Sequence, residues 1–264
     1  MSEKISLVKR QEKLVISLKK KKIAQITLRV ACALDISGSM SSLYSRGVVS
    51  EFVGKLLPFG MVFDDNAQID MWAFNNDSRE LPPAVESVYD DYVGNCMGNV
   101  RICGGTSYAP AMEDIYAEYF GNNVKMKTVT EEIEVQEERP VSGFFAKLTG
   151  KTETVTVKKT VSKQVVDDKQ VADTTPAMVF FQTDGENNDK SAVRALLTKH
   201  RNTPVYWFMV GVGNESFSFL KELARDFDNV GFIGVKNLDL SDEDLYDKLL
   251  SEEFGEWTAK FVKA

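Results

Sequence analysis

The sequence has few of the side chains on which many enzymes and soft-metal sites depend. Its 264 residues include one histidine, His200, and three scattered cysteines. An odd cysteine count without a spacing pattern argues against a disulfide framework, so we expect a reducing, cytoplasmic setting. Without a candidate Cys–His or Ser–His pair, nucleophilic catalysis has little support. We expect His200, at the end of a predicted helix, to cap that helix as a cation rather than to act in catalysis.

Long apolar runs are also absent. The sequence has no run of about 18 apolar residues, the length that is needed to cross a bilayer. Its N-terminus has no apolar segment of the signal-peptide kind. The formal net charge of -7 argues against general or specific nucleic-acid binding by the whole surface. Residues 1–23 form a basic N-terminal extension, with eight Lys and Arg against two Glu. Apolar and polar residues alternate in parts of this extension, which predicts a strand or hairpin at a sheet edge. A basic patch that binds nucleic acid or anionic lipid is the less favoured alternative.

The chain does have a regular alternation of strand-like and helix-like segments. Strands separated by helices favour a mainly parallel sheet with helices on both faces, which is an α/β fold. We expect one domain over 24–264, with Ser107 as the cap of a helix and Cys32 in the core. The predicted strands are 26–34, 67–74 with 84–88 beside it, 177–183, 204–212 and 229–235. The predicted helices are 44–63, 107–120, 190–200, 216–226 and one or more within 240–262.

Residues 122–175 interrupt this pattern. The runs 128–136 and 152–157 alternate with period two and are rich in β-branched residues. The first run is acidic and the second leads into lysines, which favours an antiparallel β-ribbon. Such an insertion is either a solvated excursion or an interaction arm. In the second case its connector, 143–150, would bring Phe144, Phe145 and Leu148 to a protein partner or to a membrane, the membrane being less favoured.

Hard oxygen ligands occur at three places along the chain. A D-x-S-x-S motif follows the first predicted strand, and Gly38 allows the sharp turn that this motif needs. A threonine follows two glycines, and an aspartate ends the strand 177–183. Ligands of open α/β sheets bind at the carboxyl ends of strands, so we expect these side chains to meet there. They are Asp35, Ser37, Ser39, Thr106 and Asp184.

These five side chains offer oxygen atoms and no soft or imidazole ligand. Oxygen ligands suit Mg²⁺, Ca²⁺ or Mn²⁺ rather than Zn²⁺ or Cu. A divalent cation wants about six oxygens, and two carboxylates with three hydroxyls leave its shell incomplete. The sequence therefore predicts a cation site, with Mg²⁺ the first candidate, that accepts one more carboxylate from an Asp or Glu of a protein partner.

With these motifs in this order, the chain resembles the von Willebrand factor A (VWA) domains that carry a metal-ion-dependent adhesion site. The matching segments are DISGS at 35–39, GGT at 104–106 and TDG at 183–185, within 24–121 and 176–262. The resemblance implies a Rossmann-like sheet of about six strands with one short antiparallel edge strand. It also implies that the serines and the threonine coordinate the metal, while Asp35 and Asp184 act largely through water.

A narrower resemblance is to the bacterial tellurium-resistance, or Ter-type, VWA proteins. It implies a cytoplasmic protein of a tellurium and chemical-stress resistance or phage-defence system, with other Ter-system proteins as possible partners. The segments that carry it are ISLVK (5–9), LLPF (56–59), FDD (63–65), DMWAF (70–74), YDDYV (89–93) and GGTSY (104–108).

Two other functions compete with a metal-dependent, non-catalytic interaction module. One is a sensor or buffer in which metal occupancy shifts the terminal helix. The other is a Mg²⁺-dependent phosphohydrolase, because Asp35 after a strand is similar to the nucleophile of haloacid-dehalogenase-type phosphatases. Those enzymes need a second aspartate two residues further on, and Ser37 occupies that position here.

Overall fold

A six-stranded sheet forms the centre of the molecule, in the order β3-β2-β1-β6-β7-β8. The computed structural model describes residues 6–121, 126–140, 152–166, 175–185, 187–236 and 240–262. All neighbouring strands are parallel except β3, which runs antiparallel to β2 at one edge. The predicted α/β class and strand number are confirmed. The strands are β1 (Arg29–Asp35), β2 (Ile69–Phe74), β3 (Ser78–Ala84), β6 (Ala177–Thr183), β7 (Val205–Val212) and β8 (Val230–Val235).

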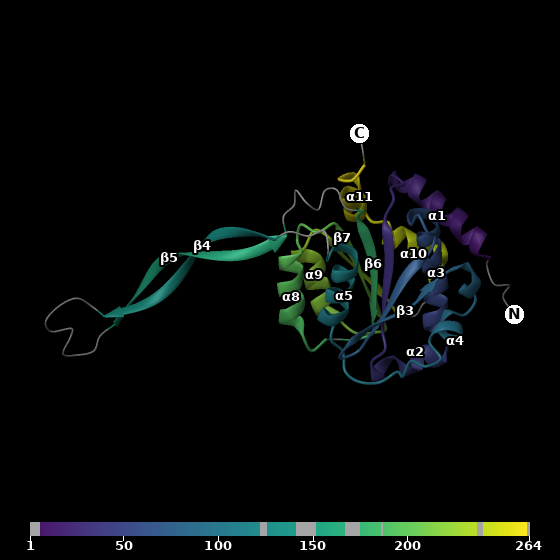
Figure 1. Cartoon of the computed structure of the whole chain (residues 1–264), viewed down its shortest axis with the longest axis horizontal. Helices are drawn as coiled ribbons and strands as arrows, with labels where there is room; N and C mark the ends of the chain where they lie inside the picture. Colours follow the sequence, from purple (N-terminus) through teal and green to yellow (C-terminus); the bar gives the residue numbers. More distant parts are fainter. Residues whose placement is uncertain are drawn as a thin grey trace.

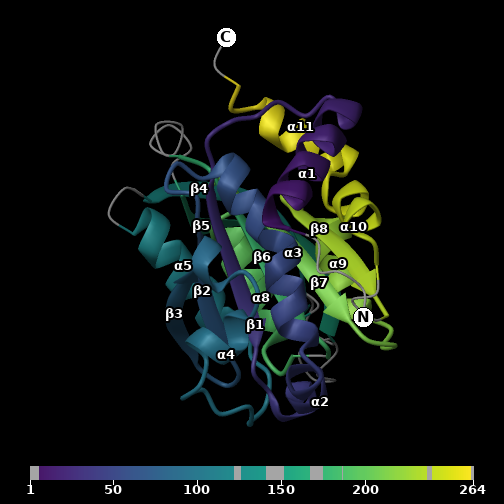
Figure 2. The same ribbon diagram turned by 90° about the vertical axis from the view of Figure 1, so that its right-hand side faces the viewer.

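Helices cover both faces of this sheet (Figure 2). One face packs against α1 (Leu7–Lys21), α3 (Val48–Phe63), α10 (Asp242–Leu249) and α11 (Glu252–Ala259). The other packs against α5 (Ala109–Phe120), α8 (Lys190–Lys199) and α9 (Ser218–Asp226). Two short helices, α2 (Ser41–Ser45) and α4 (Tyr92–Cys96), lie in the connections. We call this sheet with its helices the body. None of the helices in the described ranges is long and apolar enough to span a bilayer.

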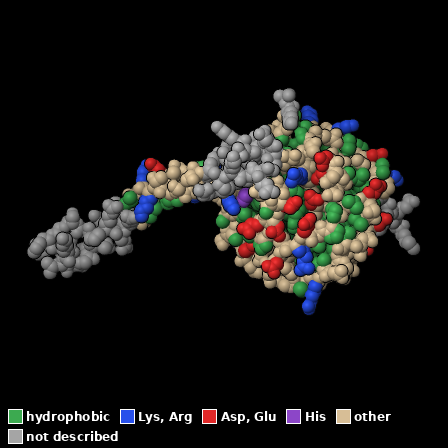
Figure 3. All heavy atoms as spheres, viewed as in Figure 1, with side chains coloured by type: hydrophobic (Ala, Val, Ile, Leu, Met, Phe, Trp, Pro, Cys, Tyr) green, Lys and Arg blue, Asp and Glu red, His purple; other side chains and the backbone are tan. Residues whose placement is uncertain are grey.

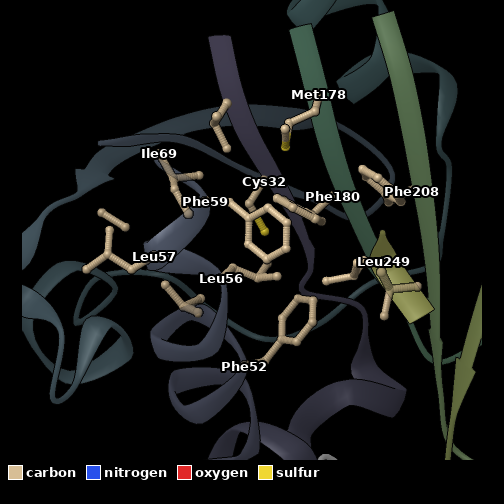
Figure 4. Close-up of a cluster of buried hydrophobic side chains, with 14 of the residues drawn as sticks. Cys32, Phe52, Leu56, Leu57, Phe59, Ile69, Met178, Phe180, Phe208 and Leu249 are labelled. Carbon is tan, nitrogen blue, oxygen red and sulfur yellow. The ribbon is translucent and has the colours of Figure 1, made fainter. Parts of the chain in front are cut away.

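The central strands are buried on both faces, so their side chains pack into two separate hydrophobic cores. In β1, Cys32 points into the core beneath α3, while its neighbours Ala31 and Ala33 point into the core beneath α5. This division follows from the two-residue period of a strand. Figure 4 shows Cys32 among the aromatic side chains of the first core, where Phe59 meets Phe180 edge to face at 5.1 Å between ring centroids. Burial raises the pKa of the Cys32 thiol, as expected of an inert core residue.

The prediction of an N-terminal edge strand is wrong, because this segment forms helix α1. Its buried side chains include Leu7, Leu14 and Leu18, which are seven and four residues apart and share one helical face in the first core. Ile16, which fitted the alternation, is 64% exposed. Ser6 caps the start of the helix. Three lysines in the last turn stabilise the helix, because their positive charge lies near the negative end of its dipole.

Two other expectations are corrected. The edge strand β3 begins at Ser78 and ends at Ala84, so it precedes the predicted segment 84–88. His200 does lie at the end of α8, but it is buried and its ring stacks on Tyr116 at 4.0 Å. Burial lowers the pKa of His200 to about 4, so the side chain is neutral near pH 7 rather than a capping cation.

The insertion forms an antiparallel ribbon that projects from the body (Figure 1). Its strands are β4 (Met126–Pro140) and β5 (Thr152–Val166), and we call them the arm. The predicted pairing of opposite charges is confirmed, since Lys163 Nζ lies 2.9 Å from Glu131 Oε2. The connector 143–150, with its two phenylalanines, lies outside the described residues.

Candidate metal centre

The candidate site begins where two adjacent parallel strands end. The register pairs Leu34 of β1 with Gln182 of β6, so the segments that follow both strands emerge side by side. Asp35 is completely buried at this point. Its Oδ1 accepts a hydrogen bond of 2.8 Å from Ser37 N, and its Oδ2 accepts one of 2.6 Å from Thr183 Oγ1. Both carboxylate oxygens are therefore held in place by neighbouring residues.

A chain of hydroxyl groups connects the first loop to the second aspartate. Ser37 Oγ lies 3.1 Å from Ser39 Oγ, and Ser39 Oγ donates to Asp184 Oδ1 at 2.8 Å. Asp35, Ser37, Ser39 and Asp184 thus form one group, which we call the oxygen cluster. The geometry brings together four of the five residues that the sequence singled out.

Thr106 lies on a third loop that is hydrogen-bonded to the other two. Cys103 N donates to Ile36 O at 2.8 Å, and Asn188 N donates to Thr106 O at 2.9 Å. Gly104 has φ +93°, a conformation that favours glycine, and its carbonyl accepts from Gly38 N at 3.2 Å. Thr106 is 8% exposed. The hydrogen bonds of this loop therefore hold Thr106 next to the ends of β1 and β6.

The predicted cap at Ser107 is wrong, because Asp189 performs this role from the loop after β6. Its Oδ1 accepts from Tyr108 N at 3.0 Å and its Oδ2 from Ala109 N at 2.8 Å. Asn187 Nδ2 also donates to Asp189 Oδ1, at 2.6 Å. Asp189 thus joins the loop after β6 to the start of α5, next to Thr106, and fixes the third loop against the second.

The electrostatics of the oxygen cluster favour a cation. Burial raises the pKa of Asp35 from its usual 3.8 to about 6, and burial also raises the pKa of Asp184. Neither carboxylate pairs with a described lysine, arginine or histidine. A buried carboxylate without a counter-charge is costly, and a bound cation would offset this cost. The donor set therefore fits a hard divalent ion.

Hydroxyl groups are essential to such a site, because carboxylates alone are too few. Within the ranges that the structure describes, no three His, Cys, Asp or Glu side chains are grouped so that they could hold a metal ion. Ser37, Ser39 and Thr106 would have to supply the remaining protein oxygens.

Sequence reasoning missed two residues that support the cluster. Thr183 donates to Asp35, and Tyr108 Oη donates to Gly185 O at 2.7 Å, beside Asp184. Thr183 precedes Asp184 directly, so its place at the end of a strand was a usable signal. Tyr108 belongs to the GGTSY segment, but no local pattern indicated its contact, which lies 77 residues away in sequence.

Two sequence comparisons match nearly the whole chain. A family model described as the vWA found in the TerF C terminus matches residues 27–130 and 121–264. A Bacillus subtilis (strain 168) protein, described as uncharacterized protein YcbR, is 30% identical over 254 residues. That match covers 94% of this chain and 84% of the relative.

A solved structure of low sequence identity shares the general fold. Proximal thread matrix protein 1 from the mussel byssus is 12% identical, with a TM-score of 0.50 over 88% of this chain. The match covers 49% of the mussel chain, so the present chain spans about half its length. BatB from Bacteroides thetaiotaomicron is 18% identical, with a TM-score of 0.43 over 88% of this chain and 99% of BatB.

Proposed function

Since the chain belongs to the family of vWA domains found in the TerF C terminus, we propose that it is a non-catalytic, divalent-cation-dependent protein-interaction module. Its setting is the cytoplasm of a bacterium, within a tellurium and chemical-stress resistance or phage-defence system. The observation that carries the proposal is the oxygen cluster, in which the buried carboxylate of Asp35 and the half-buried carboxylate of Asp184 lie beside the hydroxyl groups of Ser37 and Ser39, and neither carboxylate pairs with a described basic side chain.

The proposed cation is Mg²⁺, with Ca²⁺ or Mn²⁺ as alternatives. Ser37, Ser39 and Thr106 would offer hydroxyl oxygens to it, and Asp35 and Asp184 would balance its charge directly or through water. The hydrogen bonds from Ser37 N and Thr183 Oγ1 keep both oxygens of Asp35 oriented, which is the usual role of groups behind a metal ligand. These protein oxygens would leave one position in the coordination shell of the cation for a further oxygen ligand.

The proposed partner supplies that oxygen from an Asp or Glu side chain. Two carboxylates neutralise a divalent cation formally, but hydroxyl ligands add no further charge, so an anionic oxygen remains a favourable addition. Other Ter-system proteins are candidates for this partner. The partner's carboxylate and the cation recognise each other, so binding depends on both.

The surroundings of the site support a module without catalysis. His200, the one histidine of the sequence, is buried against Tyr116 and interacts with Thr203 rather than with the oxygen cluster. Asp35 has Ser37, not a carboxylate, two residues further on. Among the described residues, neither a histidine nor a carboxylate two positions after Asp35 is therefore available as the general acid or base of phosphoryl transfer.

A capture experiment tests the proposal at the level of the partner. The purified chain, immobilised and exposed to a lysate of its native host, should retain a partner in Mg²⁺ and release it in EDTA. Asp184→Ala should abolish this retention, because it removes half of the site's carboxylate charge. Asp228→Ala is the matched control, since Asp228 is 86% exposed and lies outside the oxygen cluster. Retention that survives EDTA, or that survives Asp184→Ala, would contradict the proposal.

A further inference from the structure

The arm has one face that carries aliphatic side chains. The register pairs Ile133 with Lys159 and Val135 with Val157. Side chains directly opposite each other on an antiparallel ribbon share a face, and alternate residues along each strand do so too. We call this face the aliphatic face. Its described side chains are Val129, Glu131, Ile133, Val135, Val157, Lys159, Val161, Lys163 and Val165.

The opposite face of the arm is polar. By the same register it carries no aliphatic side chain among its described residues, which are Thr128, Thr130, Glu132, Glu134, Gln136, Thr154, Thr156, Lys158, Thr160 and Ser162. A ribbon that served only as a solvated loop would need no such division. One apolar and one polar face are typical of a sheet that packs against something on one side.

The body covers the aliphatic face only at its base, where Val165 is buried. Neither core of the body includes an aliphatic side chain of the arm, and Ile133 is 40% exposed. The other described aliphatic side chains of this face, at positions 129, 135, 157 and 161, are half-buried. An isolated two-stranded ribbon is marginally stable in water, so this face has a reason to find a second surface. Figure 3 shows hydrophobic side chains beside charged ones along the described part of the arm.

The size of the face suits a weak, specific contact between two ribbons. Each strand has 15 residues, which at about 3.4 Å per residue gives a length of about 50 Å. Two strands with their side chains are about 10 Å wide, so each face offers about 500 Å². Packing two such faces would bury about 1,000 Å², which is near the lower limit of specific protein–protein interfaces.

The charges on this face suit a second copy of the same chain. A two-fold symmetric contact places a surface against itself, so a face of one sign would repel its own copy. Here Glu131 shares the face with Lys159 and Lys163, and both signs are present. We propose that the chain self-associates through its arm, with the aliphatic faces of two copies packed against each other. This association is independent of the oxygen cluster.

Sedimentation velocity of the full chain across a hundred-fold concentration range tests this proposal. The wild type should shift reversibly from monomer to dimer as its concentration rises. Val161→Lys should abolish the shift, because it places a charge in the contact. The register puts residue 161 opposite Glu131, so the new lysine supports the ribbon itself through an opposite-charge pair.

The adjacent residue provides a matched control. Thr160→Lys introduces the same side chain opposite Glu132, but on the polar face, and should dimerise like the wild type. Ile133→Glu, which faces Lys159, is a second disrupting variant with a cross-strand partner. Hydrogen exchange of the arm amides should slow with concentration in the wild type and in Thr160→Lys only. A wild type that remains monomeric throughout, or dimers that persist in both Val161→Lys and Ile133→Glu, would overturn the proposal.

Discussion

The body and the arm are both β-sheets, but they bury their strands to very different degrees. Every residue of β6 and β7 is buried, because helices cover both faces of the six-stranded sheet. In the arm, most described side chains of β4 and β5 are exposed or half-buried. The difference shows that the alternating β-pattern of the arm and the continuous apolar runs of the body serve different purposes. The body provides rigid strand ends for a site, and the arm provides a surface.

The largest expected effect contrasts a side chain of the body with one of the arm. Phe180→Ala should lower the free energy of unfolding by about 3–5 kcal/mol, because it leaves a cavity between Phe59 and Phe208. Ile133→Ala should cost less than about 1 kcal/mol, because Ile133 is 40% exposed. Urea denaturation of both variants, at low protein concentration, measures the two costs. Equal costs would break the comparison between body and arm.

The next largest effect is a pH dependence at the carboxyl end of β1. The pKa of Asp35 is about 6 in the folded chain and near its usual 3.8 when unfolded. Protonation therefore stabilises the fold at low pH, and this contribution is lost as the pH rises through about 6. Between pH 4 and pH 7 the loss should be about 2 kcal/mol in the absence of divalent cations.

Asp35→Asn isolates this contribution. Without divalent cations, the free energy of unfolding of the wild type should fall relative to that of Asp35→Asn as the pH rises over this range. Mg²⁺ should reduce the fall, because a cation at the oxygen cluster stabilises the ionised carboxylate. Denaturation curves at several pH values, with and without Mg²⁺, measure both effects. Parallel pH profiles for the two proteins would show that Asp35 ionises in the fold without a cost.

The smallest effect is expected when the whole arm is removed. A chain in which residue 125 is joined to residue 167 should unfold with a free energy within about 1 kcal/mol of the wild type, because neither body core includes arm side chains. Thermal and urea unfolding at low concentration check this. A much larger loss would mean that the arm stabilises the body and that the two regions are one unit.

The sequence predicted the body well because its elements follow strong local patterns. The short apolar run at β6 and the helical spacing of α5 match the elements that form there, and Pro110 lies in the first turn of α5 as expected. Helix α1 was misassigned because Leu14, Ile16 and Leu18 satisfy a two-residue period, while Leu14 and Leu18 also satisfy a helical one. The segment forms a helix because burial of one face of α1 in the core contributes more stability than the local alternation of apolar residues could.

The sequence predicted the residues of the candidate site but not the contacts that hold their loops in place. Asp35 and Asp184 stand at strand ends, where polar residues after an apolar run are conspicuous. The cap that Asp189 provides to α5 joins residues about 80 positions apart, and local reasoning assigned it to Ser107 instead. Contacts of this kind depend on the order of strands in the sheet, which a local pattern does not specify.

The most direct test of the central claim is calorimetric titration of the wild type with Mg²⁺, in parallel with Thr106→Ala and Asp184→Ala. Asp228→Ala serves as the control for removal of an exposed carboxylate, and far-UV circular dichroism confirms that each variant is folded. We predict that the wild type and the control bind Mg²⁺ with the same affinity and that both site variants bind it at least tenfold more weakly, a difference of about 1.4 kcal/mol. Full-strength binding by Thr106→Ala and Asp184→Ala would contradict the assignment of the metal to this site.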